Sequence, residues 1–246
     1  MRIYVGFDDT DTKDADRGTG KLARWFEGEL PPACAVWGVV RQQLLLDSRI
    51  PYTSHNSAAC VVVEAPGPDA AEGLIARARD HLARHFLEGS DPGLCVAAED
   101  NPALERLIAF GRLAAIEVVT PDEACSAAGG CHLSAHGGTG DGIIGAAAAV
   151  GLTADGWNGR FIEYRGLRDL PPRVSIAGLA GRGILAVSMD RDAPVPRPED
   201  WVETRGWLRP RLWGGRPILP VLGAGDGVWW SVGEKRRKAD PDSIQV

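Results

Sequence analysis

Short apolar runs alternate with longer segments of helical periodicity over the first two thirds of the chain. The apolar runs are bounded by turn residues, as buried strands are, and predict strands at residues 3–7, 33–40, 58–64, 93–97, 116–120 and 161–164. Apolar residues spaced three and four apart predict helices at residues 22–29, 69–87, 102–113 and 143–150, and Pro121 is expected to start a further helix. This mixture of strands and helices predicts an α+β protein.

The pattern changes after residue 166. Proline and glycine become frequent, helical periodicity disappears, and short apolar runs predict strands at residues 174–176, 184–189, 201–207 and 228–232. Residues 166–246 are therefore expected to form a β-rich C-terminal region, whose fold the pattern does not specify.

Composition limits the partners. The 246 residues carry a net charge of −6, from 27 basic and 33 acidic side chains, which argues against broad, nonspecific nucleic-acid binding but allows a local basic groove. The chain begins with a strand-like run and has no apolar segment of membrane-spanning length, so we expect a cytoplasmic protein with no membrane partner. The five cysteines are expected to be reduced.

Three carboxylates directly follow the first predicted strand, at Asp8, Asp9 and Asp11. Carboxylates this close repel one another, and a hard divalent cation with oxygen ligands, such as Mg²⁺, is the usual remedy. The alternative is a solvated acidic loop. The helix that comes next, however, favours a metal and phosphate site, with these three aspartates as metal ligands and catalytic residues.

Two glycine-containing turns precede helices and could hold phosphate through backbone N–H groups. The first comprises Gly18, Thr19, Gly20 and Lys21, where the lysine would add a positive charge and Thr19 is either catalytic or the N-cap of the helix. The second contains the other predicted nucleotide-binding residues, Gly140, Asp141, Gly142 and Gly145. Glycines also occur where a helix packs closely, so both interpretations of the second turn stay open.

These motifs resemble a known family. VGFDDTDT at residues 5–12 and GTGKLA at residues 18–23 are similar to the opening of the archaeal agmatinylcytidine synthetases, which modify the wobble cytidine of an isoleucine tRNA. The likeness continues, in the family's order and up to about residue 164, at Ile50-Pro51-Tyr52, Asp91-Pro92-Gly93 and residues 140–146.

The resemblance implies a kinase-like α/β domain, residues 1–57 and 121–165, that binds ATP and Mg²⁺. It also implies a ferredoxin-like α+β domain at residues 58–120, which suits the strand–helix order found there. In the family, the threonine aligned with Thr19 is linked to autophosphorylation. A second threonine usually follows it, but here that place is Gly20, followed by Lys21.

The loop after Pro51 departs from the family. Lysine and arginine are usual there, but Thr53 and His55 take their places, so a change in substrate contacts is expected. The predicted substrate-binding residues are Tyr52, Ser54, His55, Asn56 and His136.

A zinc site is disfavoured, because its ligands would be Cys125, Cys131, His132 and His136, without any CxxC pair and with two of the ligands adjacent. His81 and His85, on the helix at residues 69–87, are expected at the surface.

The sequence supports three functional hypotheses. The first is an ATP-dependent ligase or kinase-like transferase that activates a small molecule by phosphoryl or nucleotidyl transfer, with an amine such as agmatine near Glu99, Asp100 or Asp122. The second is tRNA cytidine modification, with a partner protein or the C-terminal region holding the tRNA, since the family's zinc ribbon has no counterpart here. Its basic and aromatic candidates are Arg205, Arg209, Arg211 and Arg216 with Trp207 and Trp213. The alternative for these residues, a small β core with a solvated basic face, is favoured. The third is a noncatalytic module that senses a nucleotide or polyamine.

Overall fold

A computed structural model describes residues 1–13, 15–50, 55–192, 194–204 and 206–232. The chain divides into two compact units, the first formed by residues 1–166 with 211–216 and the second by residues 167–210 with 217–246. None of the helices among the described residues has the length and apolar character needed to cross a membrane.

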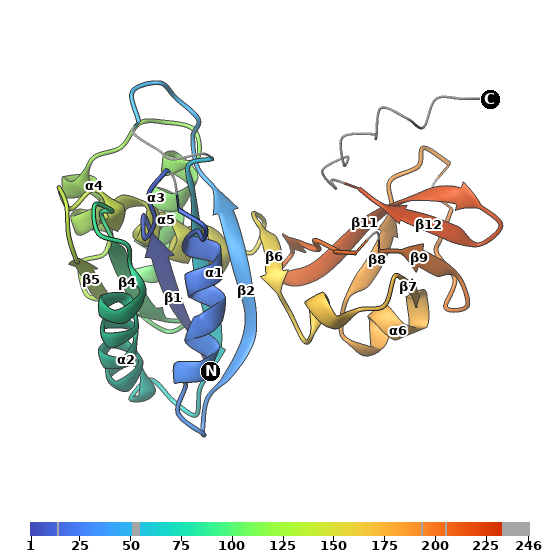
Figure 1. Ribbon diagram of the computed structural model, residues 1–246, viewed down its shortest axis with the longest axis horizontal. Coiled ribbons are helices and arrows are strands. Elements are labelled where there is room, and N and C mark those ends of the chain that lie inside the picture. Colours follow the sequence, from blue (N-terminus) through green and yellow to red (C-terminus); the bar gives the residue numbers. More distant parts are fainter. Residues whose placement is uncertain (14, 51–54, 193, 205, 233–246) are drawn as a thin grey trace. The chain divides into compact units, whose positions relative to one another are not determined.

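The first unit is built on an antiparallel sheet with β1 near its centre (Figure 1). Its strand order is β5-β4-β1-β3-β2-β6-β10. The strands are β1 (Arg2–Asp8), β2 (Ala35–Gln43), β3 (Ser57–Glu64), β4 (Gly93–Ala98), β5 (His132–Ala135), β6 (Arg160–Glu163) and β10 (Arg211–Trp213). Val5 of β1 lies opposite Val61 of β3 and Val96 of β4, so β1 is hydrogen-bonded along both edges.

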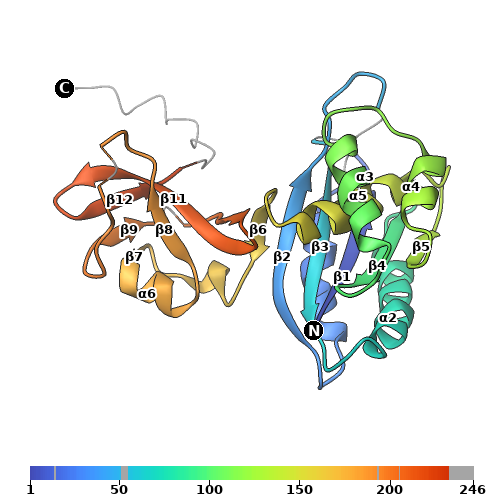
Figure 2. The ribbon, with the colours of Figure 1, turned by 180° about the vertical axis from the view of Figure 1, so that it is seen from behind.

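Helices cover both faces of this sheet (Figures 1 and 2). One face carries α1 (Thr19–Trp25), the 3₁₀ helix η1 (Phe26–Glu29) and α2 (Ala70–His85), and α5 (Gly142–Asp155) packs on the other, with α3 (Leu104–Ala114) against it and α4 (Pro121–Ala127) beside them. Eleven of the fourteen residues of α5 are buried. This explains why α5 is rich in alanine and glycine: it contacts both the sheet and α3, so bulky side chains would not fit.

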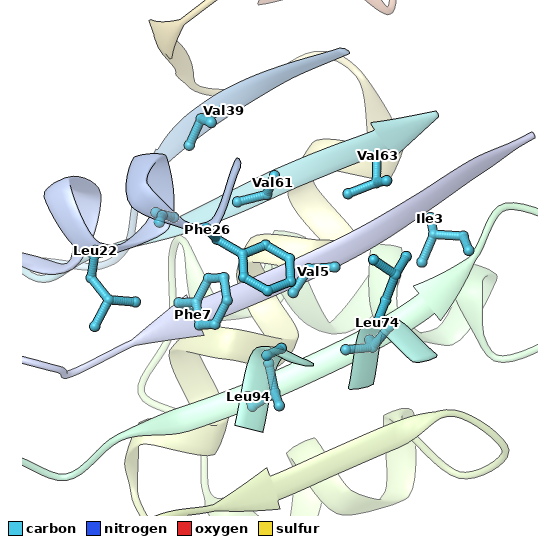
Figure 3. Packing of buried hydrophobic residues seen from close by; sticks show 14 of the residues in the cluster. Ile3, Val5, Phe7, Leu22, Phe26, Val39, Val61, Val63, Leu74 and Leu94 are labelled. Carbon is cyan, nitrogen blue, oxygen red and sulfur yellow. The ribbon is translucent and has the colours of Figure 1, made fainter. Parts of the chain in front are cut away.

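The main apolar core lies between the sheet and α1, η1 and α2 (Figure 3). Side chains alternate between the two faces of a strand, and Ile3, Val5 and Phe7 of β1 all point into this core. Phe7 packs edge-on against Phe26 of η1 at a ring-centroid distance of 5.5 Å. The intervening residues of β1, ending with Asp8, therefore face α5.

One predicted strand is wrong and one observed strand was not predicted. Residues 116–120 form no strand, and Ile116 is 69% exposed. These residues lead instead into α4, where Thr120 and Glu123 form a reciprocal capping box. Conversely, β5 was not predicted, because its half-buried, polar sequence lacks the apolar alternation of a strand.

The predicted boundary at residue 58 runs through the sheet. Strands β3 and β4, assigned to a ferredoxin-like domain, flank β1, which was assigned to the kinase-like domain. The structure joins these segments in one compact unit, with an α+β arrangement overall, as predicted from the mixed pattern.

The second unit contains β7 (Arg173–Ser175), α6 (Ile176–Gly181), β8 (Leu185–Ser188), β9 (Trp201–Glu203), β11 (Arg216–Gly225) and β12 (Val228–Ser231), preceded by η2 (Leu167–Asp169). Its strand order is β8-β11-β12-β9-β7. The sequence pattern missed α6, a short helix capped by the Ser175 hydroxyl. It also missed β11, because Pro217 and Pro220 interrupt its apolar run.

Candidate functional site

The candidate site begins at the carboxyl end of β1. A Cβ atom added to Gly145 of α5 would lie 1.7 Å from Asp8 Oδ2, so only glycine leaves room for this carboxylate. Asp9 follows with φ 46°, in the left-handed region that aspartate tolerates better than most residues. Close packing with α5 and this backbone turn therefore fix where the first two carboxylates lie.

A hydrogen-bonded network joins the acidic loop to the start of α1. Thr19 Oγ1 donates to Asp11 Oδ1 over 3.2 Å and accepts from the N–H and hydroxyl of Thr10, at 3.3 and 3.1 Å. The N–H of Thr19 donates to the same Asp11 oxygen. Gly18, rather than Thr19, occupies the N-cap. Asp11 thus accepts from a first-turn N–H and places its charge at the helix N-terminus, where a carboxylate is favourable.

A fourth carboxylate, Asp91, belongs to this site and was not among the predicted site residues. Its Oδ2 accepts from the N–H and hydroxyl of Thr139, at 3.1 and 2.6 Å, and from the N–H of Asp141 at 3.0 Å, while Oδ1 accepts from the N–H of Gly140 at 2.9 Å. The backbone N–H of Asp91 donates to the carbonyl of Asp9. Its only signal in the sequence was the Asp-Pro-Gly motif, which equally describes a turn.

The second glycine turn therefore binds a carboxylate of the chain itself. Gly138 and Gly140 adopt positive φ values, 57° and 90°, and a Cβ on Gly138 would lie 2.7 Å from Cγ of Asp91. Any phosphate held by the N–H groups of Gly140 and Asp141 would have to displace Asp91. Gly142 lies where α5 meets β4, since its Cβ would lie 1.9 Å from the Asp91 carbonyl oxygen.

The gathered carboxylates resist ionisation. Burial, followed by repulsion from Asp9, raises the pKa of Asp8 to about 7. Burial, followed by repulsion from Asp91, raises the pKa of Asp9 to about 6, and burial also raises the pKa of Asp11. Like charges and desolvation both favour the protonated acids. A cation placed among these side chains would reverse both effects, as the oxygen ligands of Mg²⁺ allow.

Replacing Asp91 with alanine should loosen the second glycine turn, because three backbone N–H groups and one hydroxyl lose their acceptor. We expect the free energy of unfolding to fall by about 1–2 kcal/mol, since water can reach this half-exposed turn. Hydrogen exchange at residues 139–141 should become faster. The matched control is Asp47→Ala, which removes a partly exposed aspartate whose partner among the described residues is Arg49. Unchanged exchange in the Asp91 variant would contradict the proposed support.

The other predicted residues do not all converge on this cluster. The pairs Leu94–Ser134 and Val96–His132 lie opposite each other in β4 and β5, and paired residues share a face. His132 and Ser134 therefore face α1 and α2, and His136 bonds to the Ser134 hydroxyl over 2.8 Å, whereas Asp8 faces α5.

Other predicted nucleotide- and substrate-binding residues contact side chains outside the acidic cluster or hydrogen-bond the backbone. The Lys21 ammonium lies 5.2 Å from the ring centre of Trp25, and a Cβ on Gly20 would contact Ile162 at 3.0 Å. His55 is exposed, while Asn56, with φ 28°, donates to the Leu45 carbonyl and so closes the connection between β2 and β3. Tyr52 and Ser54 lie outside the described residues.

Among the described residues, the four disfavoured zinc ligands do not come together as one group. Cys125 is exposed on α4, and His132 hydrogen-bonds Ser134 on a strand rather than lying on a helix. Glu99 and Asp100, suggested for an amine, follow the far end of β4: Gly93 pairs with Asp8, whereas the N–H of Glu99 donates to the Arg2 carbonyl. The length of β1, roughly 20 Å at 3.3 Å per residue, separates them from the acidic cluster.

The basic and aromatic candidates divide between the two units. In the second unit, the guanidinium carbons of Arg168 and Arg209 lie 4.4 and 4.0 Å from the ring centre of Trp207. Arg211 lies over Trp213 in the first unit. Arg205 is outside the described residues.

No protein family model and no curated protein matches this chain. Solved structures do. A tRNA fluorescent labeling enzyme is 29% identical with a TM-score of 0.52, and the match covers 61% of this chain and 36% of that enzyme's chain. An apo agmatidine synthetase that acts on an isoleucine tRNA is 28% identical with a TM-score of 0.50, covering 61% and 35%. The same synthetase in complex with that tRNA and ATP is 28% identical with a TM-score of 0.52, covering 61% and 36%.

The chain spans about a third of the length of these structures. The TM-scores and identities show that, over the matched part, the chain has a fold like that of the isoleucine-tRNA agmatidine synthetase.

Proposed function

We propose that the chain is an ATP-dependent, tRNA-modifying enzyme that holds Mg²⁺–ATP at the carboxyl end of β1. The observation that carries this proposal is the set of carboxylates gathered around Asp8, whose pKa burial raises to about 7. Such a cluster is costly in the absence of a cation, and Mg²⁺ bound through carboxylates commonly accompanies substrate phosphates. The structural likeness to a synthetase crystallised with tRNA and ATP adds support.

The proposed roles follow from position. Asp8 and Asp9 would supply metal ligands, because their ionised forms gain most from a cation. Asp11 would orient the Thr19 hydroxyl, to which it is already hydrogen-bonded. Asp91 would keep the second glycine turn beside the metal. In phosphoryl and nucleotidyl transfer, positioning and neutralisation of charge supply most of the catalysis. These side chains would contribute to both by holding the cation that neutralises the phosphates.

The proposed co-substrate is an amine such as agmatine, and the proposed acceptor is a cytidine of tRNA. The support is the activity named for the structural neighbours, agmatidine synthesis on an isoleucine tRNA. The shared region is about a third of those chains, so the experiment also tests whether this chain binds tRNA without a partner protein.

The test measures binding first and turnover second. Mg²⁺–ATP should raise the melting temperature, whereas ATP with EDTA should not. Release of AMP or ADP from ATP is then followed with agmatine alone, with the isoleucine tRNA alone and with both, and the tRNA is analysed for a change in mass. Nucleotide release that requires both partners, together with modified tRNA, is the expected result.

Other outcomes separate the alternatives. Turnover with agmatine and no dependence on tRNA would replace tRNA modification with small-molecule activation. Nucleotide binding without turnover in any arm would point to a sensing module. No stabilisation by any nucleotide with Mg²⁺ would remove the proposal. Asp47→Asn, at a partly exposed aspartate paired with Arg49, is the matched control for each aspartate variant of the cluster.

A further inference from the structure

Two histidines and a glutamate meet on the face of the sheet opposite Asp8. His81 and His85 lie one turn apart on α2, with ring centroids 4.7 Å apart, and Glu29 ends η1. One possible ligand atom from each of the three side chains lies within 4.8 Å of the others. Among the described residues, these three side chains come close enough to one another to share an ion. The expectation that both histidines lie at the surface is wrong for His81, which is fully buried.

The buried ring of His81 has one occupied and one unoccupied nitrogen. Its Nε2 lies 3.0 Å from the carbonyl oxygen of Leu22. A carbonyl can only accept, so Nε2 carries the proton and Nδ1 of the neutral ring presents a lone pair. Burial lowers the pKa of His81, which agrees with a neutral ring. Nδ1 is buried and makes no hydrogen bond with any described residue.

That lone pair points towards a negative charge. Nδ1 of His81 lies 3.7 Å from Glu29 Oε1, too far for a hydrogen bond, while the other carboxylate oxygen accepts from Arg84 over 2.8 Å. Two acceptors facing each other at this distance repel, and a positive group between them would relieve the repulsion. The second histidine, His85, stands beside them with its ring against Trp25 at a centroid distance of 5.6 Å.

We infer that Glu29, His81 and His85 form a binding site for a transition-metal dication such as Zn²⁺, joining η1 to α2. Two imidazoles and one carboxylate are a ligand set that Zn²⁺ takes, leaving a fourth position for water. Ligand atoms around a tetrahedral Zn²⁺ lie roughly 3.3 Å apart, so small side-chain movements would close the site. The Leu22 carbonyl already provides the outer hydrogen bond that fixes the tautomer of a metal-bound histidine.

A positively charged side chain near the site competes with a metal for Glu29. Arg84 is half exposed and binds Glu29, Arg77 donates to the Glu29 carbonyl, and Arg17 donates to the His85 carbonyl. Arg84 is thus the cation that balances the Glu29 carboxylate. A bound metal would either share this carboxylate with Arg84 or take the place of Arg84. This site is separate from the acidic cluster, because His81 packs against Phe7, on the face of β1 opposite Asp8.

The test titrates chelator-treated full-length protein with Co²⁺ in excess Mg²⁺, followed by competition with Zn²⁺. One equivalent should bind with the visible absorption of low-symmetry cobalt and without a thiolate charge-transfer band. Zn²⁺ at a hundredfold excess over its dissociation constant should raise the melting temperature by at least about 5 °C. His85→Gln and Glu29→Gln should each weaken binding at least about tenfold, the smallest loss expected when a group supporting a metal is removed.

The controls make each outcome decisive. His132→Gln removes a histidine of the same sheet face that is hydrogen-bonded to Ser134, and should leave affinity within about threefold. Arg84→Gln removes the competing cation while keeping Glu29, and should leave affinity equal or tighter. Binding that survives both His85→Gln and Glu29→Gln, that is lost in Cys131→Ser, or that does not occur at all would overturn the inference. These variants leave Asp8 and the nucleotide assay untouched, so failure here is distinct from failure of the proposed function.

Discussion

Asp8→Asn should abolish ATP-dependent turnover and yet stabilise the metal-free protein. Asparagine keeps the shape beside Gly145 but removes the charge, so the proposed Mg²⁺ site loses a ligand. Loss of the cation that neutralises the reacting phosphate costs about 100-fold or more in rate. The opposite effect on stability follows from the pKa of Asp8, which burial raises from 3.8 to about 7.

The sign of the pH effect is fixed by this upward shift. The stability associated with a raised carboxyl pKa is fully present below about pH 4 and is lost as pH rises towards 7. In EDTA, the wild-type protein should therefore be less stable at pH 7.5 than at pH 5.5, and Asp8→Asn should flatten this dependence. At pH 7.5 in EDTA, Asp8→Asn should raise the free energy of unfolding by about 2 kcal/mol. This is less than the full pKa shift implies, because solvent screens a half-buried group.

Urea unfolding in EDTA, repeated with Mg²⁺, provides the measurement. Mg²⁺ should stabilise the wild type at pH 7.5 and leave Asp8→Asn unchanged. Asp47→Asn should behave as the wild type in both series. If Asp8→Asn is instead less stable than the wild type without metal, burial and repulsion do not destabilise the Asp8 carboxylate, and the cluster does not require a cation.

The second large effect contrasts two glycine-to-alanine changes in helices. A Cβ at Gly151 of α5 would lie 1.8 Å from the Leu107 carbonyl oxygen of α3. Because this is backbone, it cannot rotate away, and the helices must separate at a cost of about 3 kcal/mol or more. Gly73 of α2 is exposed with nothing within 4 Å of an added Cβ, so Gly73→Ala should stabilise by about 0.5–1 kcal/mol.

Denaturant unfolding of the two variants decides the matter, since the chemical change is the same in both. Destabilisation of Gly73→Ala, or a neutral Gly151→Ala, would contradict the close packing of α3 on α5. The result bears on the site as well, because α5 also presents Gly145 to Asp8.

Periodicity alone identified most of the helices and strands of the first unit, since buried strands such as β1 and β3 and the amphipathic α2 have strong apolar patterns. It failed where tertiary context decides. The apolar residues near Ile116 had no neighbouring strand to pair with, and β5 is a short edge strand with polar side chains. In the second unit, the prolines of β11 concealed the longest strand of that sheet.

The candidate site was partly visible in the sequence, because Asp8, Asp9 and Asp11 are neighbours in the chain. Asp91 could not be assigned to it, since β4 brings that residue to β1 only through the antiparallel pairing of Gly93 with Asp8. The Glu29–His81–His85 group was invisible for the same reason: helical spacing relates the two histidines, but only folding brings η1 against them.

The place of β1 in its sheet has a consequence for how the protein opens. A strand hydrogen-bonded on both edges and covered by helices on both faces exchanges its amide protons only in the most extensive unfolding events. The loop from Asp9 to Thr12 directly follows this slowly exchanging strand. Local fluctuations therefore do little to separate its carboxylates and relieve their repulsion. Binding of a cation there should therefore slow exchange throughout the first unit, rather than in the loop alone.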